Sequence, residues 1–340
     1  MENELNIFAD DAFSVFSMTE AINVIPNLYG KVSGMGLFIP EGVNTLSVGI
    51  EQQNGVISIL PDVPRGGPAT KNKTGKRTLK TVSIPHFPLD DVITAQSIQG
   101  IRGYRGEPRL ATVQTVVNRK LIEMKRKHDI TREWLLCGAL KGIVYASDAT
   151  TELANFYDLL GVTAKTVDFT LGTTTVEMKD KCAEVKDHIE ANLLGDTMTG
   201  IKALCGRAWF NKFTSHKSVK DAYSLWDKSP NPFRNDVSKG FPFQEIDFEV
   251  YVGNAPDDAG NSRKFIADDE VRFFPMGTTD TFREYNAPAD MIEFANTMGL
   301  PFYASQELLK HGKGVEIYTE TDLLPVCRRP GVLVKGYTSN

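Results

Sequence analysis

This 340-residue chain has 17 prolines, but none between Pro108 and Pro230. Proline interrupts helices because it lacks a backbone N–H and its ring clashes with the preceding turn. Within the interval, apolar residues recur at spacings of three and four from Val113 to Leu135. This pattern predicts one long helix over about 109–137, ended by Gly138. Asp129-Ile130-Thr131 is the point where such a helix can kink or divide.

The segment 42–88, before this helix, has the pattern of a long two-stranded excursion. Apolar and polar residues alternate up to an Asn54-Gly55 turn, which is followed by a return strand over 56–59. Three prolines and three glycines exclude long regular structure over 61–77. Residues 78–84 again read as a strand. We therefore expect an excursion with an irregular, basic tip.

The remaining chain mixes helix and strand patterns without a regular βαβ period, which predicts an α+β fold. Thr174 and Glu177 have the spacing of a capping box for a helix over about 176–194. The other expected helices are 218–226 and 289–298, and the expected strands lie at 201–209, 237–254, 264–274, 315–318 and 331–337.

The net charge of -5 is distributed unevenly. Residues 1–30 hold five acidic residues and no lysine or arginine, whereas residues 62–86 carry net +5 and residues 243–290 carry net -7. Each cluster alone is typical of a solvated face. Together they can be complementary between copies of the chain, because charge pairing across an interface sets register and steers encounter.

The amino-terminal segment 1–36 has the pattern of an arm. Phe8, Phe13 and Phe16 are spaced by five and three, as in a short amphipathic helix, and Gly30, Gly34 and Gly36 then break the pattern. The segment lacks the basic-then-apolar order of a signal peptide. No apolar run is long enough to predict a transmembrane helix.

The chain carries no motif of a known catalytic, cofactor or metal site. It lacks a GxxxxGK[ST] loop, a GxGxxG after a strand, a GxSxG elbow and an HExxH pair. The four cysteines are widely spaced and predict free, buried thiols. Cys205 and His216 remain a conceivable catalytic couple, because catalytic partners need not be neighbours in sequence. We expect no cofactor, no metal and no enzyme activity.

Four stretches resemble a known family: Phe13–Phe38, Arg65–Pro68, Ile84–Arg102 and Asp129–Val144. The third reads IPHFPLDDVITAQSIQGIR, and the fourth combines DITRE with GALKG at the end of the expected long helix. They resemble the lambda-type capsid protein E family, the major capsid proteins of tailed bacteriophages. The carboxy-terminal half is similar mainly in composition and in the order of its elements.

This resemblance implies a Hong Kong 97-type capsid fold with five parts. They are an N-terminal arm (1–40), an extended loop (41–90), a peripheral domain with a spine helix (91–174), an axial domain (175–295) and a return to the peripheral domain (296–340). Such subunits form hexamers and pentamers of an icosahedral shell around double-stranded DNA. Family members commonly work with scaffold, portal and decoration proteins, without a membrane, and assemble in the host cytoplasm into the virion.

We expect two sets of residues at contacts between subunits. The extended loop offers Arg65, Lys71, Lys73, Lys76, Arg77 and Lys80, and the arm offers Phe8, Phe13 and Phe16. Two alternatives stay open. One is a nucleic-acid-binding module that uses the basic 65–80 loop, whose mark is steep salt dependence. The other is an enzyme of a type that the sequence motifs do not reveal.

Overall fold

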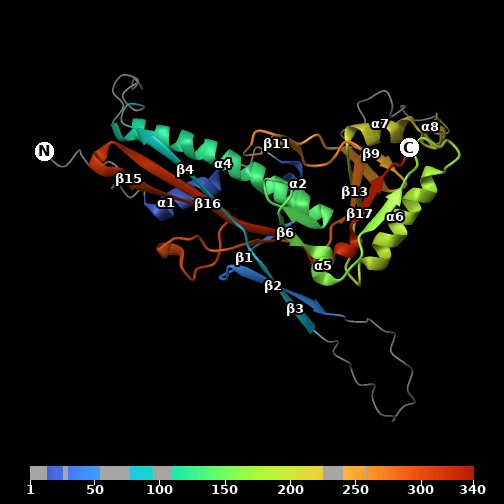
Figure 1. Cartoon of the computed structure of the whole chain (residues 1–340), viewed down its shortest axis with the longest axis horizontal. Helices are drawn as coiled ribbons and strands as arrows, with labels where there is room; N and C mark the ends of the chain where they lie inside the picture. Colours follow the sequence, from blue (N-terminus) through green and yellow to red (C-terminus); the bar gives the residue numbers. More distant parts are fainter. Residues whose placement is uncertain are drawn as a thin grey trace, which may run out of the picture.

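The computed structural model describes residues 14–25, 30–53, 77–94, 96, 109–224, 240–257 and 259–340. Over these residues the molecule is elongated, with one long helix along its axis and a β-sheet towards each end (Figure 1). A two-stranded hairpin leaves the body between the sheets. Helices and strands are mixed along the chain, so the α+β prediction is confirmed.

The first sheet has five strands arranged around one long strand, β16. The first half of β16 lies between β15 and β4, and its second half pairs with β14. Strand β1 then pairs in parallel with β14, whereas the other pairs are antiparallel. The bounds are β1 Ile39–Gly42, β4 His86–Thr94, β14 Phe282–Asn286, β15 Tyr303–Leu308 and β16 Gly314–Cys327.

The second sheet has six strands in the order β7-β17-β13-β8-β10-β9. Its core is aromatic: the Phe213 ring stacks on Phe248 with centroids 4.6 Å apart and on Trp209 at 5.0 Å. Helices α6, α7 and α8 lie around this sheet (Figure 1). The bounds are β7 Lys165–Asp168, β8 Gly200–Cys205, β9 Phe241–Phe243, β10 Ile246–Val250, β13 Glu270–Met276, β17 Val334–Tyr337, α6 Met178–Asn192, α7 Arg207–Ser215 and α8 Lys217–Ser224.

The long helix α4, Arg109–Lys141, connects the two larger hydrophobic clusters of the described residues. At 1.5 Å per residue it is about 50 Å long. Val117, Leu121 and Met124 are buried in the smaller cluster beneath α1. About three turns after Met124, Leu135, Leu136 and Leu140 enter the main cluster. The helix therefore gives a continuous apolar stripe along the molecule, as its spacing predicts.

Three short ribbons and three short helices complete the described part of the chain, with 3-10 turns at Ile292–Phe294, Lys310–Gly312 and Pro330–Val332. No described helix has both the length and the apolar character needed to cross a bilayer. The bounds are β2 Ser47–Gln53, β3 Arg77–Ser83, β5 Ile143–Tyr145, β6 Glu152–Asn155, β11 Asn254–Pro256, β12 Ser262–Lys264, α1 Val15–Val24, α2 Lys31–Gly34 and α5 Phe156–Leu160.

Several local predictions were wrong at the ends of helices. The long helix passes Asp129 without dividing and ends at Lys141, before Gly142, and not at Gly138. Gly138 lies inside the helix because strand β5 packs closely there: an added Cβ would lie 3.0 Å from the Cα atom of Val144. Gly142 has a φ of 82° and donates its N–H to Ala139, the conformation that ends helices at glycine.

The expected capping box of α6 was also wrong, because a different helix supplies the cap. Glu177 is the N-cap residue, but its side chain makes no capping bond. Instead, the hydroxyl of Ser218 in α8 accepts the N–H of Met178 at 3.2 Å and donates to Glu177. The start of α6 is therefore fixed by a tertiary contact that local spacing does not reveal.

Two segments adopt another secondary structure than the one predicted. The expected strand 201–209 ends at Cys205, and helix α7 begins two residues later because Gly206 turns the chain against the 267–268 backbone. The expected helix 289–298 contains only the 3-10 turn Ile292–Phe294. The loop around that turn is held by the hydroxyl of Tyr303, which accepts from the N–H of Leu300 and donates to the carbonyl of Ala287.

Candidate assembly interface

The projecting hairpin consists of β2 and β3, joined in register from the Ser47–Ser83 pair to the Gln53–Arg77 pair. Both legs begin in the same sheet: β1 leads into β2, and β3 leads into β4 (Figure 1). The excursion predicted from the sequence is therefore present. The partner of β2 is β3, while the short return strand expected at 56–59 lies outside the described residues.

The base of the hairpin is packed, not free. Val48 and Ile50 are buried and belong to the main hydrophobic cluster. The N–H of Ile84 donates to the carbonyl of Leu46 at 2.9 Å, which closes the base between the two legs. On the other leg, Lys80 Nζ lies 3.5 Å from the backbone oxygen of Asp158 in α5. The direction in which the hairpin leaves the body is thus set by burial at its root.

Helix α1 near the amino terminus docks on the five-stranded sheet. Met18 and Ile22 are buried in the smaller hydrophobic cluster. The hydroxyl of Thr19 donates to the carbonyl of Ala304 at 3.2 Å and accepts its N–H at 3.1 Å, so α1 is bonded directly to β15. Phe16 is 62% exposed, although its ring also meets that of Phe294 in a T-shaped contact with centroids 5.3 Å apart. Such a large exposed aromatic residue is available for contact with another molecule.

Helix α2 is held by an acidic side chain of α4. The carboxylate of Glu133 accepts the backbone N–H groups of Lys31, Val32 and Ser33 at 2.7, 2.8 and 3.0 Å. These are the donors that a helix N-terminus leaves unpaired. The hydroxyl of Tyr251 donates to the same carboxylate at 2.7 Å. Glu133 therefore ties the segment that leads to β1 and the hairpin to the long helix.

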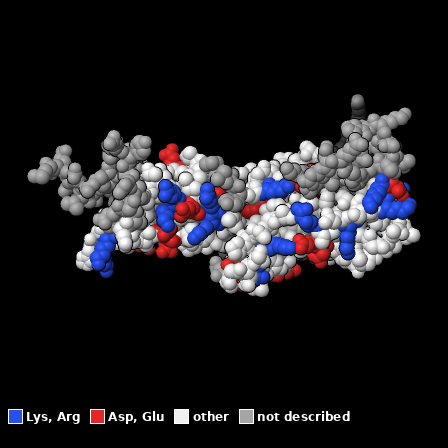
Figure 2. All heavy atoms as spheres, turned by 90° about the horizontal axis from the view of Figure 1, so that it is seen from above, with Lys and Arg blue, Asp and Glu red and all other residues white. Residues whose placement is uncertain are grey.

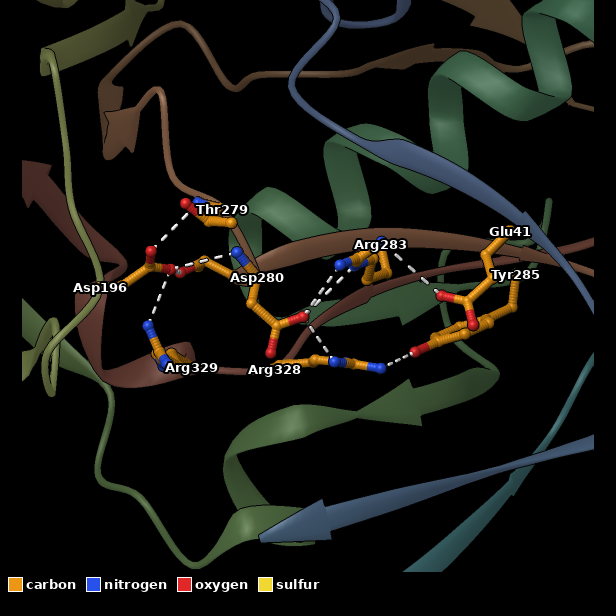
Figure 3. Close-up of polar contacts among 9 residues, drawn as sticks. Glu41, Asp196, Thr279, Asp280, Arg283, Tyr285, Arg328 and Arg329 are labelled. Carbon is orange, nitrogen blue, oxygen red and sulfur yellow. Dashed lines mark hydrogen bonds and ion pairs between the residues drawn. The ribbon is translucent and has the colours of Figure 1, made fainter. Parts of the chain in front are cut away.

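A network of charged residues joins the two sheets (Figure 3). Asp280 accepts from Arg328 at 2.6 Å and from Arg283 at 3.2 Å, and Arg283 lies 3.8 Å from Glu41 of β1. Arg328 also donates to the hydroxyl of Tyr285. The network reaches from β1 through β14 to the end of β16, next to the turn that leads into β17 of the second sheet.

Asp196 forms the other end of this network, beside the six-stranded sheet. It pairs with Arg329 at 2.8 Å and accepts the N–H of Thr279 at 3.1 Å and the hydroxyl of Thr281 at 2.8 Å. Burial would raise the pKa of Asp196, but these hydrogen bonds outweigh it and hold the pKa below its usual range. The two arginines that follow β16 therefore pair with two different aspartates: Arg328 with Asp280 and Arg329 with Asp196. The consecutive arginines, Arg328 and Arg329, are the signal for this joint in the sequence.

The acidic segment 243–290 is largely neutralised within the subunit. Eight of its eleven acidic residues form ion pairs with lysine or arginine, several from distant elements such as Lys186 of α6, Lys202 of β8 and Arg132 of α4. Acidic and basic residues are accordingly interspersed on the face in Figure 2. This segment is therefore a weaker receiver for a basic loop than its net charge indicates.

The structure places only part of the predicted interface. Phe16 lies on α1 and Lys80 on β3, whereas Arg77 is described for its backbone alone, in β3. Phe8, Phe13, Arg65, Lys71, Lys73 and Lys76 lie outside the described residues. Phe16 and Lys80 are on different parts of the molecule (Figure 1), so the structure does not bring these two sets together within one subunit.

The geometry does not support the couple of Cys205 and His216. Cys205 donates to the carbonyl of Ala203, and burial raises the pKa of its thiol well above the ordinary value. Both ring nitrogens of His216 are used by the backbone: Nε2 lies 3.1 Å from the carbonyl of Thr173, and Nδ1 accepts the N–H of Ser218. All four cysteines are free and buried, as predicted.

Comparison with known proteins agrees with this architecture. The family model described as phage major capsid protein E matches residues 14–338. The major capsid protein of Pseudomonas phage KPP10 is 30% identical over 341 residues, which cover 95% of this chain and 96% of that protein.

Solved structures share the fold at low sequence identity. A protein of an Escherichia coli CFT073 prophage aligns with a TM-score of 0.58 and 13% identity, over 96% of this chain and 99% of that chain. A chain in the mature capsid of bacteriophage PhiM1 aligns with a TM-score of 0.51 and 11% identity, over 92% and 88%.

Two sheets, a long connecting helix and a projecting hairpin define the Hong Kong 97-type capsid fold, the class of structural proteins that form phage shells. The family match covers nearly the whole chain, so the chain belongs to the phage major capsid protein E family. The resemblance seen in the sequence, the fold class and the structural role are confirmed.

Proposed function

We propose that this subunit assembles with copies of itself into hexamers and pentamers of an icosahedral shell that encloses double-stranded DNA. The shell forms in the host cytoplasm with the help of a scaffold and a portal protein, and a decoration protein joins it afterwards. In this proposal the subunit has no catalytic role. The alternative of a separate nucleic-acid-binding module is disfavoured because the basic loop is part of a hairpin anchored at both ends.

The observation that carries this proposal is the rooted hairpin. Both legs emerge from one sheet, and Val48 and Ile50 fix the base in the hydrophobic core. The described part of the hairpin therefore leaves the body from a fixed base, and in this proposal the residues beyond Gln53 and Arg77 extend towards another subunit. The basic residues of the tip then meet an adjacent subunit. Each exposed pair contributes only about 0.2–1 kcal/mol, but a ring of subunits repeats the array.

We propose that the two sheets correspond to the two domains of the capsid fold. The six-stranded sheet with α6, α7 and α8 would be the axial domain, and the five-stranded sheet with α4 the peripheral domain. On this basis β7 and β17 join the axial domain, and β14 joins the peripheral one. The arm comprises residues 1–40, within which α1 and α2 are docked on their own subunit.

The register of the hairpin permits a sharp test. Gln53 and Arg77 are paired, so residues 54–76 can be replaced by an Asn-Gly turn, which is favoured in two-residue hairpins. The purified variant, with and without scaffold, should fold as judged by circular dichroism but form no closed shells in negative-stain electron microscopy. A second variant, in which residues 54–76 are replaced by a Gly/Ser segment of the same length, shows whether assembly needs the length of the tip or its side chains. Normal shells from the Asn-Gly variant would refute the role of the hairpin.

A further inference from the structure

His86, Glu320 and Asp322 converge at the root of the hairpin, although more than 230 positions separate the histidine from the two acids. His86 opens β4, directly after the hairpin, and lies opposite Asp322 of β16. Glu320 and Asp322 are two residues apart on one strand and so share a face of the sheet. One potential ligand atom from each of the three residues lies within 4.8 Å of the others.

The two carboxylates are buried without a strong cation. Glu320 is 0% and Asp322 5% exposed. Within the described residues neither forms an ion pair with lysine or arginine, and the one ion-pair contact is that of Asp322 Oδ1 with His86 Nδ1, at 2.6 Å. Buried carboxylates are normally paired with a cation or bound to a metal. The cluster therefore contains two carboxylates but only one side chain, His86, that can carry a positive charge.

The surroundings also fix the orientation of one carboxylate. Tyr318 donates its hydroxyl to Glu320 Oε2 at 2.7 Å, and the backbone N–H of Asp290 donates to Oε1 at 2.8 Å. Such outer hydrogen bonds are typical of metal ligands, because they hold the ligand in position. The side chain of His86 is 41% exposed, which gives an ion access from solvent and leaves room for water to complete its coordination.

We propose that His86, Glu320 and Asp322 bind a divalent transition-metal cation of the Zn²⁺ type, which fastens the root of the hairpin to β16. One imidazole nitrogen and two carboxylate oxygens form a ligand set that Zn²⁺ accepts, with water in the fourth position. Neighbouring ligands of a tetrahedral Zn²⁺ are about 3.4 Å apart, given bonds of about 2.1 Å. On binding the metal, the His86–Asp322 contact, now 2.6 Å, widens by less than 1 Å, and any separation near the 4.8 Å limit shortens by about 1.4 Å.

The test uses the full chain, stripped of metal with EDTA and titrated with ZnCl₂ by calorimetry. We expect one equivalent to bind, and His86→Ala and Asp322→Asn to weaken this binding at least tenfold. The control is His311→Ala, because His311 lies on an exposed 3-10 turn away from the cluster; it should bind Zn²⁺ like wild type. Zn²⁺ should also raise the melting temperature of wild type and His311→Ala by several degrees, but not that of His86→Ala.

Two outcomes would overturn the site. One is unchanged Zn²⁺ affinity in His86→Ala and in Asp322→Asn, with both variants folded as judged by circular dichroism. The other is sulfur ligation in X-ray absorption spectra, which would assign the metal to the cysteines. A preference for Ca²⁺ over Zn²⁺ would refute the cation class. The measurement is made on the subunit, so its result does not depend on whether the proposed shell assembles.

Discussion

Arg132 of the long helix and Glu284 of β14 form a forked ion pair across the centre of the molecule. The arginine Nε lies 3.0 Å from both carboxylate oxygens, and Nη2 lies 2.9 Å from Oε2. The Glu284 side chain is fully buried. Because Glu133 holds α2 from the next position of the same helix, adjacent acidic and basic residues of α4 bind two different parts of the subunit.

Removing only the arginine should destabilise the subunit strongly. Arg132→Met leaves a buried carboxylate without its partner, which costs about 3–5 kcal/mol in other proteins. We expect a loss of about 3 kcal/mol in the free energy of unfolding, measured by urea denaturation. The double variant Arg132→Met/Glu284→Met removes both charges and should recover most of the loss. A single variant as stable as wild type would show that the pair does not hold α4 on the sheet.

The docking of α1 changes what an arm deletion can test. The sequence pattern predicts one arm over the amino-terminal segment, but Met18, Thr19 and Ile22 are buried in the body. Deleting residues 1–28 would expose Leu121 and Phe302 beneath α1, so we expect this variant to melt at a lower temperature and to aggregate. Deleting residues 1–13 leaves α1 in place and should keep the melting temperature of wild type.

The shorter deletion therefore tests whether the arm has a role in assembly. We expect subunits that lack residues 1–13 to fold but to form fewer closed shells, as counted by negative-stain microscopy. Phe16→Ser serves as a matched point variant, because Phe16 is exposed and its loss should affect contacts between subunits more than folding. Normal shell yields from both variants would assign assembly to other surfaces.

His128 should make stability depend on pH. Burial first, and then the charges of Lys125 and Lys127, lower the pKa of His128 to about 4 from its ordinary 6.5. The folded state thus keeps the ring neutral, with Nε2 2.9 Å from the hydroxyl of Thr319. Below pH 6.5 the unfolded chain gains a proton that the folded chain does not, so stability falls as the pH falls towards 4.

The expected size of this effect is about 3 kcal/mol, at about 1.4 kcal/mol per pKa unit. His128→Gln should remove this part of the pH dependence in urea unfolding measured from pH 7.5 to 4. His311→Gln, on an exposed turn, is the control and should leave the slope unchanged. If wild type and His128→Gln lose stability in parallel over this range, His128 does not titrate as inferred.

The basic tip can be tested by reversing its charge. We expect Lys73→Glu/Lys76→Glu/Arg77→Glu to leave the subunit folded and to impair shell closure. The control, Lys73→Arg/Lys76→Arg/Arg77→Lys, keeps the charge and should assemble. Wild-type assembly should weaken as salt rises, because exposed pairs are screened. Equal shell yields from the reversed variant and wild type at low and moderate salt would mean that the basic side chains of the tip face solvent and have no role in assembly.

The spacing of apolar residues predicted those helices and strands whose position depends on neighbouring residues in the sequence. The apolar spacing from Val113 to Leu135 predicted α4, because one stripe of that helix packs into the two larger hydrophobic clusters. Gly138 misled us because a glycine at the end of such a pattern is usually a cap, whereas here it admits β5 against the helix. A capping residue and a packing glycine have the same sequence signature.

Contacts between distant residues could not be derived in this way. Nothing near Met178 indicates that Ser218 caps it, and nothing near His86 indicates that Glu320 and Asp322 lie opposite. The net charge of 243–290 was equally misleading, since its partners are spread over α4, α6 and β8. The family resemblance predicted the fold. The contact of His86 with Glu320 and Asp322 became evident only from the pairing register of β4 and β16 in the structure.

The pairing of β4 with β16 has a mechanical consequence. The hairpin continues directly into β4, and nine residue pairs, from His86–Asp322 to Thr94–Gly314, hold β4 to its neighbour. A pull on the hairpin along its length therefore loads these bonds in shear, all at once, instead of opening them one by one as in a zipper. This geometry distributes any tension on the hairpin over a whole strand.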